Sequence, residues 1–227
     1  MLRQLPRWAW FGGGLLALIA GTINAVGFMG FRHQAITHLT GTTTLLGTAL
    51  AEANAAEAIH WLLAILSFVG GAVLSGFIVQ QHTLKLGRRY GIALMVESLL
   101  LFAAVPLIHH GNDGGLYLAS IACGLQNAMV STYSGATFRT THLSGIFTDL
   151  GIYIGQRLRG LEVDALRIQV CLVVAGGFLA GATVGSLLFN VLQERTLLIP
   201  ALLTGVSGLV YAIYRHRRMS IPGDHRG

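Results

Sequence analysis

The stretch THLTGTTTLLG (residues 37–47) occurs a second time, with small changes, as THLSGIFTDLG (residues 141–151). The two copies share the pattern T-H-L-[ST]-G-x-x-T-x-x-G at an offset of 104 residues. Upstream of them, GTINA (21–25) matches GLQNA (124–128) at an offset of 103. Each copy joins an apolar segment to a polar segment rich in Thr, Ser and Gly. A period of this length in an apolar chain predicts an internal duplication that forms two bundled halves.

The composition is that of a membrane protein. The chain has 227 residues, of which 53% are apolar and 11% charged, and its mean hydropathy is +0.65. Ordinary soluble domains are less apolar and more charged. A helix needs about 20 apolar residues to cross the hydrocarbon core, and six stretches approach or exceed that length: 8–31, 61–79, 90–108, 115–138, 168–193 and 196–214. We therefore predict an all-α integral membrane protein with six spanning helices.

Two polar segments, residues 38–58 and 142–156, fit lipid less well. Each carries several Thr, Ser, Asn or acidic side chains and has only a short apolar core. Irregular backbone at membrane depth is tolerated only where protein or water shields it from lipid. We expect two short re-entrant or broken helices buried within the protein. The alternative is that both segments cross the membrane, which gives eight spans.

The distribution of basic residues favours six spans. With six spans and both termini cytoplasmic, 13 of the 15 Lys and Arg residues lie inside, and only Arg32 and Arg195 lie outside. With eight spans the count is 9 inside and 6 outside, whereas cytoplasmic loops normally carry a clear excess. Three spans per half would invert one half relative to the other, as in many secondary transporters. The chain is then one membrane domain over residues 1–227, with repeat one at about 8–108, repeat two at about 115–214 and a basic cytoplasmic tail at 215–227.

Two pairs of motifs resemble a known family. They are A-G-x-x-N-A-x-G-F (20–28) with TGTTTLLG (40–47), and GLQNA (124–128) with SGIFTDLG (144–151). Nearly the whole chain is similar to the YoaK-like family of bacterial inner-membrane proteins, a family of unknown function. The resemblance implies a multi-pass protein of the bacterial inner membrane. It also implies Asp in place of Asn24 and T-G-N in place of Thr40-Gly41-Thr42, so this chain departs from the family in its first half.

Two acidic residues lie in segments that we expect at membrane depth. Asp149 follows Ser144 and Gly145 by about one turn, and Glu97 lies in the apolar stretch 90–108. An ionisable group at such depth costs a few kcal/mol, so it is retained for a partner, a cavity or a proton. We interpret both acids as candidates for proton coupling. A neutral, hydrogen-bonded carboxyl is the alternative for either, and exposure at the interface is a third reading for Asp149.

The repeated histidines indicate a binding site. His38 and His142 each precede a Ser/Thr-Gly step, and the hydroxyl of Thr40 or Ser144 would cap a short helix that starts there. Free N–H groups and the helix dipole would then attract an anion; the alternative is a capped loop with histidines at the interface. Asn24 and Asn127 either line the same cavity or hold the backbone of the polar segments. The candidate substrate or ion ligands are Asn24, His38, Thr40, Gly41, Thr44, Asn127, His142, Ser144, Gly145, Thr148 and Asp149.

Other functional classes have less support. No two histidines share a helix face with a carboxylate, so we predict no metal site and no cofactor. Ser144, His142 and Asp149 have the residue types of a hydrolase, but a histidine two residues from a serine on extended backbone faces elsewhere, so we predict no enzyme. There is no nucleotide-binding or nucleic-acid-binding motif. The expected partners are the lipid bilayer and a small solute, and homo-oligomerisation stays open.

We therefore expect a membrane transporter or channel for a small polar or anionic solute, with proton coupling as an option. Its site would lie between the two T-H-L-[ST]-G segments, near the bilayer midplane. A membrane scaffold or lipid-interacting protein is the alternative, because one fold can serve several functions.

Overall fold

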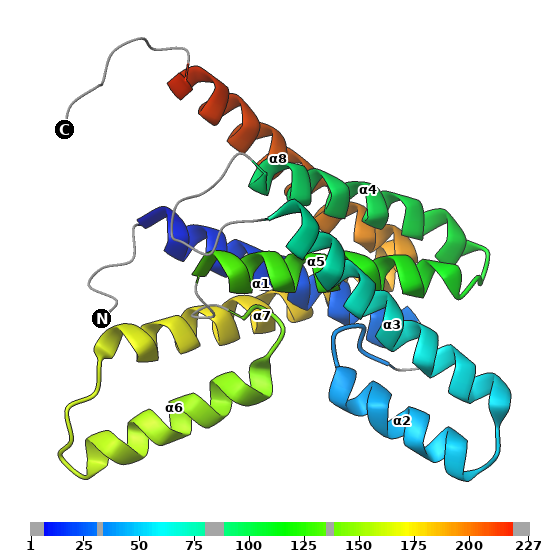
Figure 1. Cartoon of the computed structure of the whole chain (residues 1–227), viewed down its shortest axis with the longest axis horizontal. Helices are drawn as coiled ribbons and strands as arrows, with labels where there is room; N and C mark the ends of the chain where they lie inside the picture. The colour runs from blue at the N-terminus through cyan, green and yellow to red at the C-terminus, as the bar shows by residue number, and fades with distance from the viewer. Residues whose placement is uncertain (1–6, 31–33, 80–88, 135–138, 220–227) are drawn as a thin grey trace.

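The computed structural model describes the backbone of residues 7–30, 34–79, 89–134 and 139–219. Within these ranges the chain is helical and contains no strand, as Figure 1 shows. The elements are α1 (Arg7–Gly30), α2 (Leu39–Ala51), α3 (Ala55–Ile78), α4 (Tyr90–His109), α5 (Gly114–Ser134), α6 (Leu143–Leu158), α7 (Ala165–Leu192), the 3-10 helix η1 (Gln193–Leu197) and α8 (Leu198–Met219). The predicted all-α class is confirmed.

Most of the described α-helices are long, and two are short. α1, α3, α4, α5, α7 and α8 have 24, 24, 20, 21, 28 and 22 residues. At about 1.5 Å per residue each of them reaches roughly 30 Å or more, the thickness of the hydrocarbon core. α2 and α6 have 13 and 16 residues, which corresponds to roughly 20 and 24 Å. Neither short helix is long enough to cross the core.

The apolar character of the long helices supports the prediction of a membrane protein. Within the described chain, four stretches are long and apolar enough to cross a membrane: Ala9–Gly30, Ala55–Ile78, Tyr90–His109 and Ala165–Tyr214, the last of which contains both α7 and α8. α5 is not among them, because it carries polar side chains such as Ser120, Gln126 and Asn127. Ser120 and Gln126 are buried against other helices, so α5 does not need the apolar surface of a helix that faces lipid.

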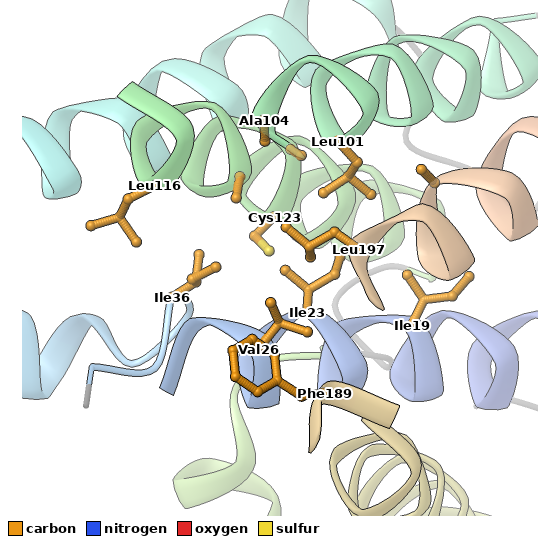
Figure 2. Close-up of a cluster of buried hydrophobic side chains, with 13 residues drawn as sticks. Ile19, Ile23, Val26, Ile36, Leu101, Ala104, Leu116, Cys123, Phe189 and Leu197 are labelled. Carbon is orange, nitrogen blue, oxygen red and sulfur yellow. The ribbon is translucent and has the colours of Figure 1, made fainter. Parts of the chain in front are cut away.

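One cluster of buried apolar side chains lies mainly between α1, α4 and α5. Figure 2 shows Ile19, Ile23 and Val26 of α1 facing Leu101 of α4 and Cys123 of α5. All five side chains are at most 1% exposed. Because lipid tails are as apolar as these side chains, the cluster stabilises the fold through close packing more than through removal from water.

α1 and α7 cross at very short range and run parallel. A Cβ added to Gly181 would overlap the carbonyl oxygen of Leu18, and a Cβ added to Gly177 would lie 2.8 Å from the carbonyl oxygen of Gly14. The residue numbers rise together along the two helices, which defines the parallel direction. The Thr22 hydroxyl donates to the Gly181 carbonyl oxygen at 3.1 Å. Gly177, Gly181 and Gly185, which are spaced four residues apart, all lie at this crossing.

α3 and α5 form a matching parallel pair. A Cβ on Gly71 would overlap the carbonyl oxygen of Ile121, and a Cβ on Gly124 would overlap that of Phe68. Nearer the starts of both helices, the Nδ1 atom of His60 lies 2.9 Å from the Tyr117 hydroxyl. The numbers of the contacting residues therefore rise together along α3 and α5, so these two helices are parallel, as α1 and α7 are.

α4 and α8 pack in the opposite sense. Gly91 near the start of α4 approaches Gly208 in α8, with 3.1 Å from its added Cβ to the Gly208 carbonyl oxygen. One turn or more later, the Ser98 hydroxyl donates to the Ala201 carbonyl oxygen at 2.7 Å. Residue numbers rise along α4 while they fall along α8, so this pair is antiparallel.

The two short helices flank the bundle without touching each other. Among the described elements, α2 contacts α3 and α6 contacts α7. In Figure 1 their first turns face the middle of the molecule's long axis, whereas their last turns point to its opposite ends. The packed residues recur at helical spacing, Leu45 and Ala49 in α2 and Ile146 and Leu150 in α6. Each short helix is therefore held along one side only.

Two expectations about the polar segments are wrong. The segment 38–58 is two helices, because the Asn54 side chain accepts the Glu57 N–H at 3.2 Å and starts α3 at Ala55. The segments are also not buried within the single chain. Thr42 and Ala49 are the buried residues of α2, and Ile146 is the buried residue of α6. Packing against one neighbour leaves the other side of each helix exposed.

Gly181→Ala is expected to destabilise the protein, because the new methyl group would force α1 away from α7. Overpacking of this kind costs about 1–3 kcal/mol. Gly176→Ala, in the same helix, is the matched control, since nothing lies within 4 Å of its added Cβ. Thermal unfolding in detergent should show a lower midpoint for Gly181→Ala only. Equal midpoints for the two variants would contradict the close crossing.

Candidate functional site

The starts of α2 and α6 carry the repeated motif. Their N-cap residues are His38 and His142, and neither side chain makes a capping hydrogen bond. The prediction that Thr40 and Ser144 cap these helices is wrong, because the helices already begin at Leu39 and Leu143. The two hydroxyl residues thus lie inside the first turn. The first N–H groups of each helix have no partner within the helix and none from the capping side chain.

Each N-cap histidine lies over its own first turn. A Cβ on Gly41 would lie 2.7 Å from Nδ1 of His38, and a Cβ on Gly145 would overlap the ring of His142. Glycine at these two positions leaves room for the imidazole. Both histidines are exposed in the single chain. Each helix start therefore combines free N–H groups, the positive end of a helix dipole and an imidazole, an arrangement that favours an anion.

Asn24 holds the connection between α1 and α2. Its Oδ1 atom accepts the Thr37 N–H at 2.8 Å and the Thr37 hydroxyl at 3.1 Å. Gln34 donates to the Thr42 hydroxyl oxygen at 2.9 Å, and the Thr42 hydroxyl in turn donates to the His38 carbonyl oxygen at 3.1 Å. Of the two alternatives for Asn24, these contacts favour the backbone clamp over a cavity-lining role.

The corresponding polar groups of the second half have fewer hydrogen-bond partners. Gln126 donates to the Leu16 carbonyl oxygen at 2.6 Å. Its Oε1 atom, the Oδ1 atom of Asn127 and the Thr140 hydroxyl are buried with no hydrogen-bond partner within the described chain. Buried polar atoms without partners are rare and costly, so this end of α5 is a place where a water molecule or solute would be stabilised.

Asp149 lies on the exposed side of α6 together with Ser144 and Thr148. The hydroxyls of Thr44 and Thr148 donate to carbonyl oxygens one turn back, at 3.0 and 2.9 Å. The structure thus places Thr40, Gly41 and Thr44 on α2, with His38 as its N-cap, and Ser144, Gly145, Thr148 and Asp149 on α6, with His142 as its N-cap. Asn24 and Asn127 lie apart from them on α1 and α5. The two sets are not in contact within one chain, because α2 and α6 do not touch.

Among the acidic residues that the structure describes, Glu97 is the one that is completely buried. It is 0% exposed, and neither of its carboxyl oxygens has a hydrogen-bond partner within the described residues. The Tyr90 hydroxyl donates to the Met129 carbonyl oxygen at 3.1 Å, and Gly115 packs on Ala104 at the other end of the α4–α5 hairpin. This antiparallel register places Glu97 opposite the stretch 122–126 of α5. A charged carboxylate there would be strongly disfavoured unless a proton or cation accompanied it.

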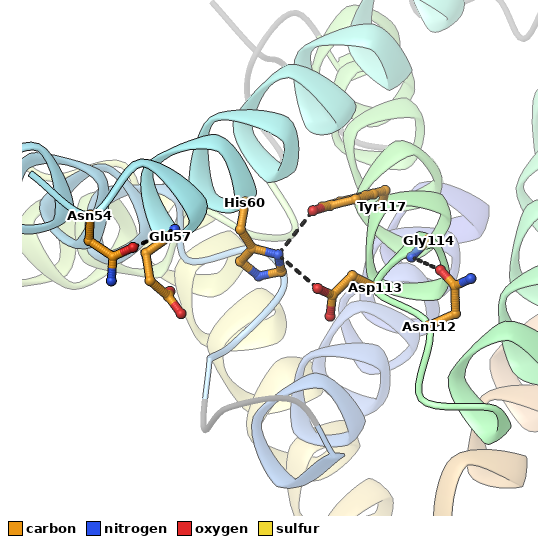
Figure 3. A network of polar contacts seen from close by, with 7 residues as sticks. All are labelled: Asn54, Glu57, His60, Asn112, Asp113, Gly114 and Tyr117. Carbon is orange, nitrogen blue, oxygen red and sulfur yellow. Dashed lines mark hydrogen bonds and ion pairs between the residues drawn. The ribbon is translucent and has the colours of Figure 1, made fainter.

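The sequence analysis missed one polar cluster. Figure 3 shows His60 of α3 facing both Asp113 and Tyr117, with Nδ1 2.9 Å from the Tyr117 hydroxyl and 3.3 Å from a carboxylate oxygen of Asp113. His60 is 6% exposed, and its Nε2 atom has no partner in the described chain. Asn112 caps the start of α5 by accepting the Gly114 N–H at 2.7 Å. The one feature of the sequence that could have indicated this cluster is a lone histidine inside an apolar stretch.

This cluster joins α3 to the start of α5, since His60 contacts both Asp113 and Tyr117. It does not have the composition of a metal site. No group of three or more His, Cys, Asp or Glu side chains that could hold a metal ion occurs among the residues that the structure describes.

Comparison with known proteins places the chain in a family. The family described as protein of unknown function (DUF1275) matches residues 13–210. The UPF0700 transmembrane protein YoaK of Bacillus subtilis (strain 168) is 26% identical over 149 residues, which cover 63% of this chain and 66% of that protein. No solved structure matches the chain. The resemblance to YoaK-like proteins is confirmed, and because the family match covers most of its length, the chain belongs to the DUF1275 family.

Proposed function

We propose that this protein carries a small polar or anionic solute across the bacterial inner membrane. The observation that carries the proposal is the placement of α2 and α6, two helices too short to span, which start near the middle of the bundle and end at its opposite ends. Discontinuous helices that start at membrane depth are the usual solute-binding elements of secondary transporters.

The directions of the helix pairs support six spans. If α2 and α6 do not cross, successive crossings make α1 parallel to α7, α3 parallel to α5, and α4 antiparallel to α8. If all eight helices crossed, α4 and α8 would be parallel. The contacts of Gly91 with Gly208 and of Ser98 with Ala201 run antiparallel, which favours six spans. The same topology leaves 13 of 15 basic residues in the cytoplasm.

The glycine contacts also support an inverted repeat. Gly21 faces Phe178 in the α1–α7 pair, and Gly124 faces Phe68 in the α3–α5 pair. Gly21 and Gly124 are the first residues of the matching sequences GTINA and GLQNA. Each pair joins one helix from each half, and the two contacts are equivalent when the halves are exchanged. With three spans per half, this equivalence would correspond to an axis in the membrane plane.

The helix starts give the site its preference for negative charge. His38 and His142 would face the solute together with the free N–H groups of Thr40, Gly41, Ser144 and Gly145. Thr44, Thr148 and Asp149 would line the path beyond them. Asp149 and Glu97 are the acids available for proton coupling, since they lie on α6 and in the core.

A catalytic role has less support. Among the described hydrogen bonds, none joins the Ser144 hydroxyl to His142, and a serine nucleophile needs its base within hydrogen-bond reach. We therefore propose a non-enzymatic function, with a scaffold or lipid-interacting role as the alternative.

Topology can be tested by cysteine accessibility in intact cells, in a chain whose Cys123 and Cys171 are replaced by Ala. Six spans place Asn54→Cys and Gly111→Cys outside, where a membrane-impermeant maleimide labels them. Leu161→Cys is the control, because both topologies keep it inside. Protection of Asn54→Cys and Gly111→Cys from external reagent would support eight spans instead.

Asp149→Asn should leave folding intact, because Asp149 is exposed, but it should abolish solute flux. The assay follows swelling of proteoliposomes in formate, acetate, nitrate, sulfate or phosphate, with urea as an uncharged probe. Glu162→Gln, an exposed acid outside the helices, is the control. Wild-type protein that moves none of these probes, or an Asp149→Asn variant as active as wild type, would refute the assigned role.

Glu97→Gln should separate solute flux from proton flux, because glutamine has the shape of glutamic acid and cannot release a proton. In proteoliposomes containing a pH-sensitive dye, wild-type protein should change the internal pH when a transported anion is supplied. The variant should carry the anion without that pH change. Unaltered proton movement in Glu97→Gln would show that the carboxyl has only a packing role.

A further inference from the structure

Two buried side chains on neighbouring helices keep three oxygen atoms without a hydrogen-bond partner. Glu97 of α4 and Gln126 of α5 are each 0% exposed. Both carboxyl oxygens of Glu97 and the Oε1 atom of Gln126 lack a partner within the described chain. Most buried polar atoms in proteins are paired. These three oxygens therefore need an explanation that the packing of α4 on α5 alone does not give.

Glu97 lies on the side of α4 that packs against α5. Two contacts fix this side: the Tyr90 hydroxyl donates to the Met129 carbonyl oxygen at 3.1 Å, and a Cβ added to Gly115 would lie 2.9 Å from the Ala104 carbonyl oxygen. Glu97 is seven residues from Tyr90 and seven from Ala104, so the three share one helix face. The carboxyl group therefore belongs to the interface with α5.

Gln126 lies on the matching side of α5. It is three residues from Met129 and eleven from Gly115, and both spacings return to the same side of a helix. The antiparallel register puts Glu97 level with about Ala122, so Gln126 is one turn, roughly 6 Å, further along the axis. The long side chains of glutamate and glutamine can bridge that distance.

The helices around Glu97 offer no positive charge to neutralise a carboxylate. α5 has no Asp, Glu, Lys or Arg, and neither do residues 8–30 of α1 or 198–214 of α8. The titratable group that the register brings nearest is the buried thiol of Cys123, which is not positively charged in either protonation state. The other described ionisable side chains of α4 and of the elements packed against it lie toward the ends of α4 or face other elements; they are Glu57, His60, Arg89, Tyr90, His109, Tyr117, Glu194, Arg195, Tyr211 and Tyr214.

One proton suits this arrangement better than a metal ion does. A carboxylate and an amide oxygen are both acceptors and cannot bond each other, whereas a protonated carboxyl has one O–H donor. If that O–H donates to Oε1 of Gln126, a single proton neutralises the charge of Glu97 and pairs both side chains. Calcium and magnesium ions take about six or more oxygen ligands, and these two side chains supply three.

The matching segments of the two halves show that packing does not require an amide at this position. In the alignment of GTINA with GLQNA, Gln126 matches Ile23. Ile23 is also 0% exposed, so an apolar side chain fills the matching buried position. The amide of Gln126 instead joins two helices, because its Nε2 atom donates to the Leu16 carbonyl oxygen of α1 at 2.6 Å. Its Oε1 atom remains as the free acceptor.

We propose that Glu97 and Gln126 form a binding site for one proton, in which Gln126 accepts the hydrogen bond of the protonated carboxyl. Proton binding forms the O–H bond of Glu97 and the hydrogen bond to Gln126. Proton release leaves a charged carboxylate beside an amide oxygen, and the two repel each other. Because Gln126 also holds Leu16, the bound proton joins α4 to α5 and α1. The site deepens the proton coupling of the proposed function, on which its part in transport rests.

Infrared spectroscopy of the full chain in lipid vesicles at neutral pH tests this site without measuring transport. The wild-type spectrum should contain the C=O stretching band of a protonated carboxyl, and Glu97→Gln should lose it. Gln126→Leu should shift that band, because the carboxyl loses its acceptor. Ser120→Ala is the matched control, since it removes another buried polar group from a different side of α5; it should leave the band in place. No band lost in Glu97→Gln, or an unshifted band in Gln126→Leu, would overturn the proposal.

A second variant and a second measurement complete the test. Gln126→Asn keeps the amide but shortens the side chain by one methylene, so it replaces Gln126→Leu if the leucine variant does not fold. The thermal midpoint of wild-type protein should be equal in lithium, sodium, potassium and choline chloride. A rise with one metal ion that Glu97→Gln abolishes would overturn the proposal in favour of a metal cation.

The outcome can be separated from that of the proposed function, because the spectra do not depend on flux. A protein that shows the expected bands but moves no probe would refute the transport proposal only. Proton-coupled flux together with a band that Gln126→Leu and Gln126→Asn leave unshifted would refute this proposal only.

Discussion

The approach of helix backbones at the glycine crossings is the constraint on which the rest of the bundle depends. At Gly21, Gly71, Gly124 and Gly181 a Cβ would overlap a carbonyl oxygen of the neighbouring helix. Within lipid, helices gain little from hiding apolar surface and associate through close van der Waals contact and hydrogen bonds. These crossings set the directions of α1, α3, α5 and α7. The positions of α2 and α6 depend on these crossings too, because short connections join α2 to α3 and α6 to α7.

Much of this arrangement could be predicted from the sequence, because apolar runs and small-residue spacing report directly on helix packing. The helix boundaries in the polar segments could not. A run containing Glu52, Asn54 and Glu57 reads as one polar element, yet Glu52 is the C-cap of α2 and Asn54 is the N-cap of α3. A polar residue at the end of a helix and one at the start of another look alike in a single sequence. The exposure of α2 and α6 could not be predicted either, since a polar pattern does not show whether the rest of the same chain covers a helix.

The candidate site shows a similar division. His38 and His142 were found by the repeat, and their exposed positions at two helix starts follow from it. Their role as N-cap residues was not predicted, because the preference of Ser and Thr for that position pointed to Thr40 and Ser144. His60 was missed altogether. Its partner Tyr117 is 57 residues away, and only the parallel packing of α3 on α5 brings the two side chains together.

The polar residues of the bundle fall into two groups with different explanations. Thr22, Ser98 and Asn24 donate to or accept from backbone groups of other segments, so holding the fold together accounts for them. Glu97, Gln126 and Asn127 each keep a buried oxygen without a partner among the residues that the structure describes, and such atoms weaken a fold rather than stabilise it. Stability therefore explains the first group and leaves the second unexplained. Under the proposed function, a proton or solute in the core beside α5 would supply the missing partners.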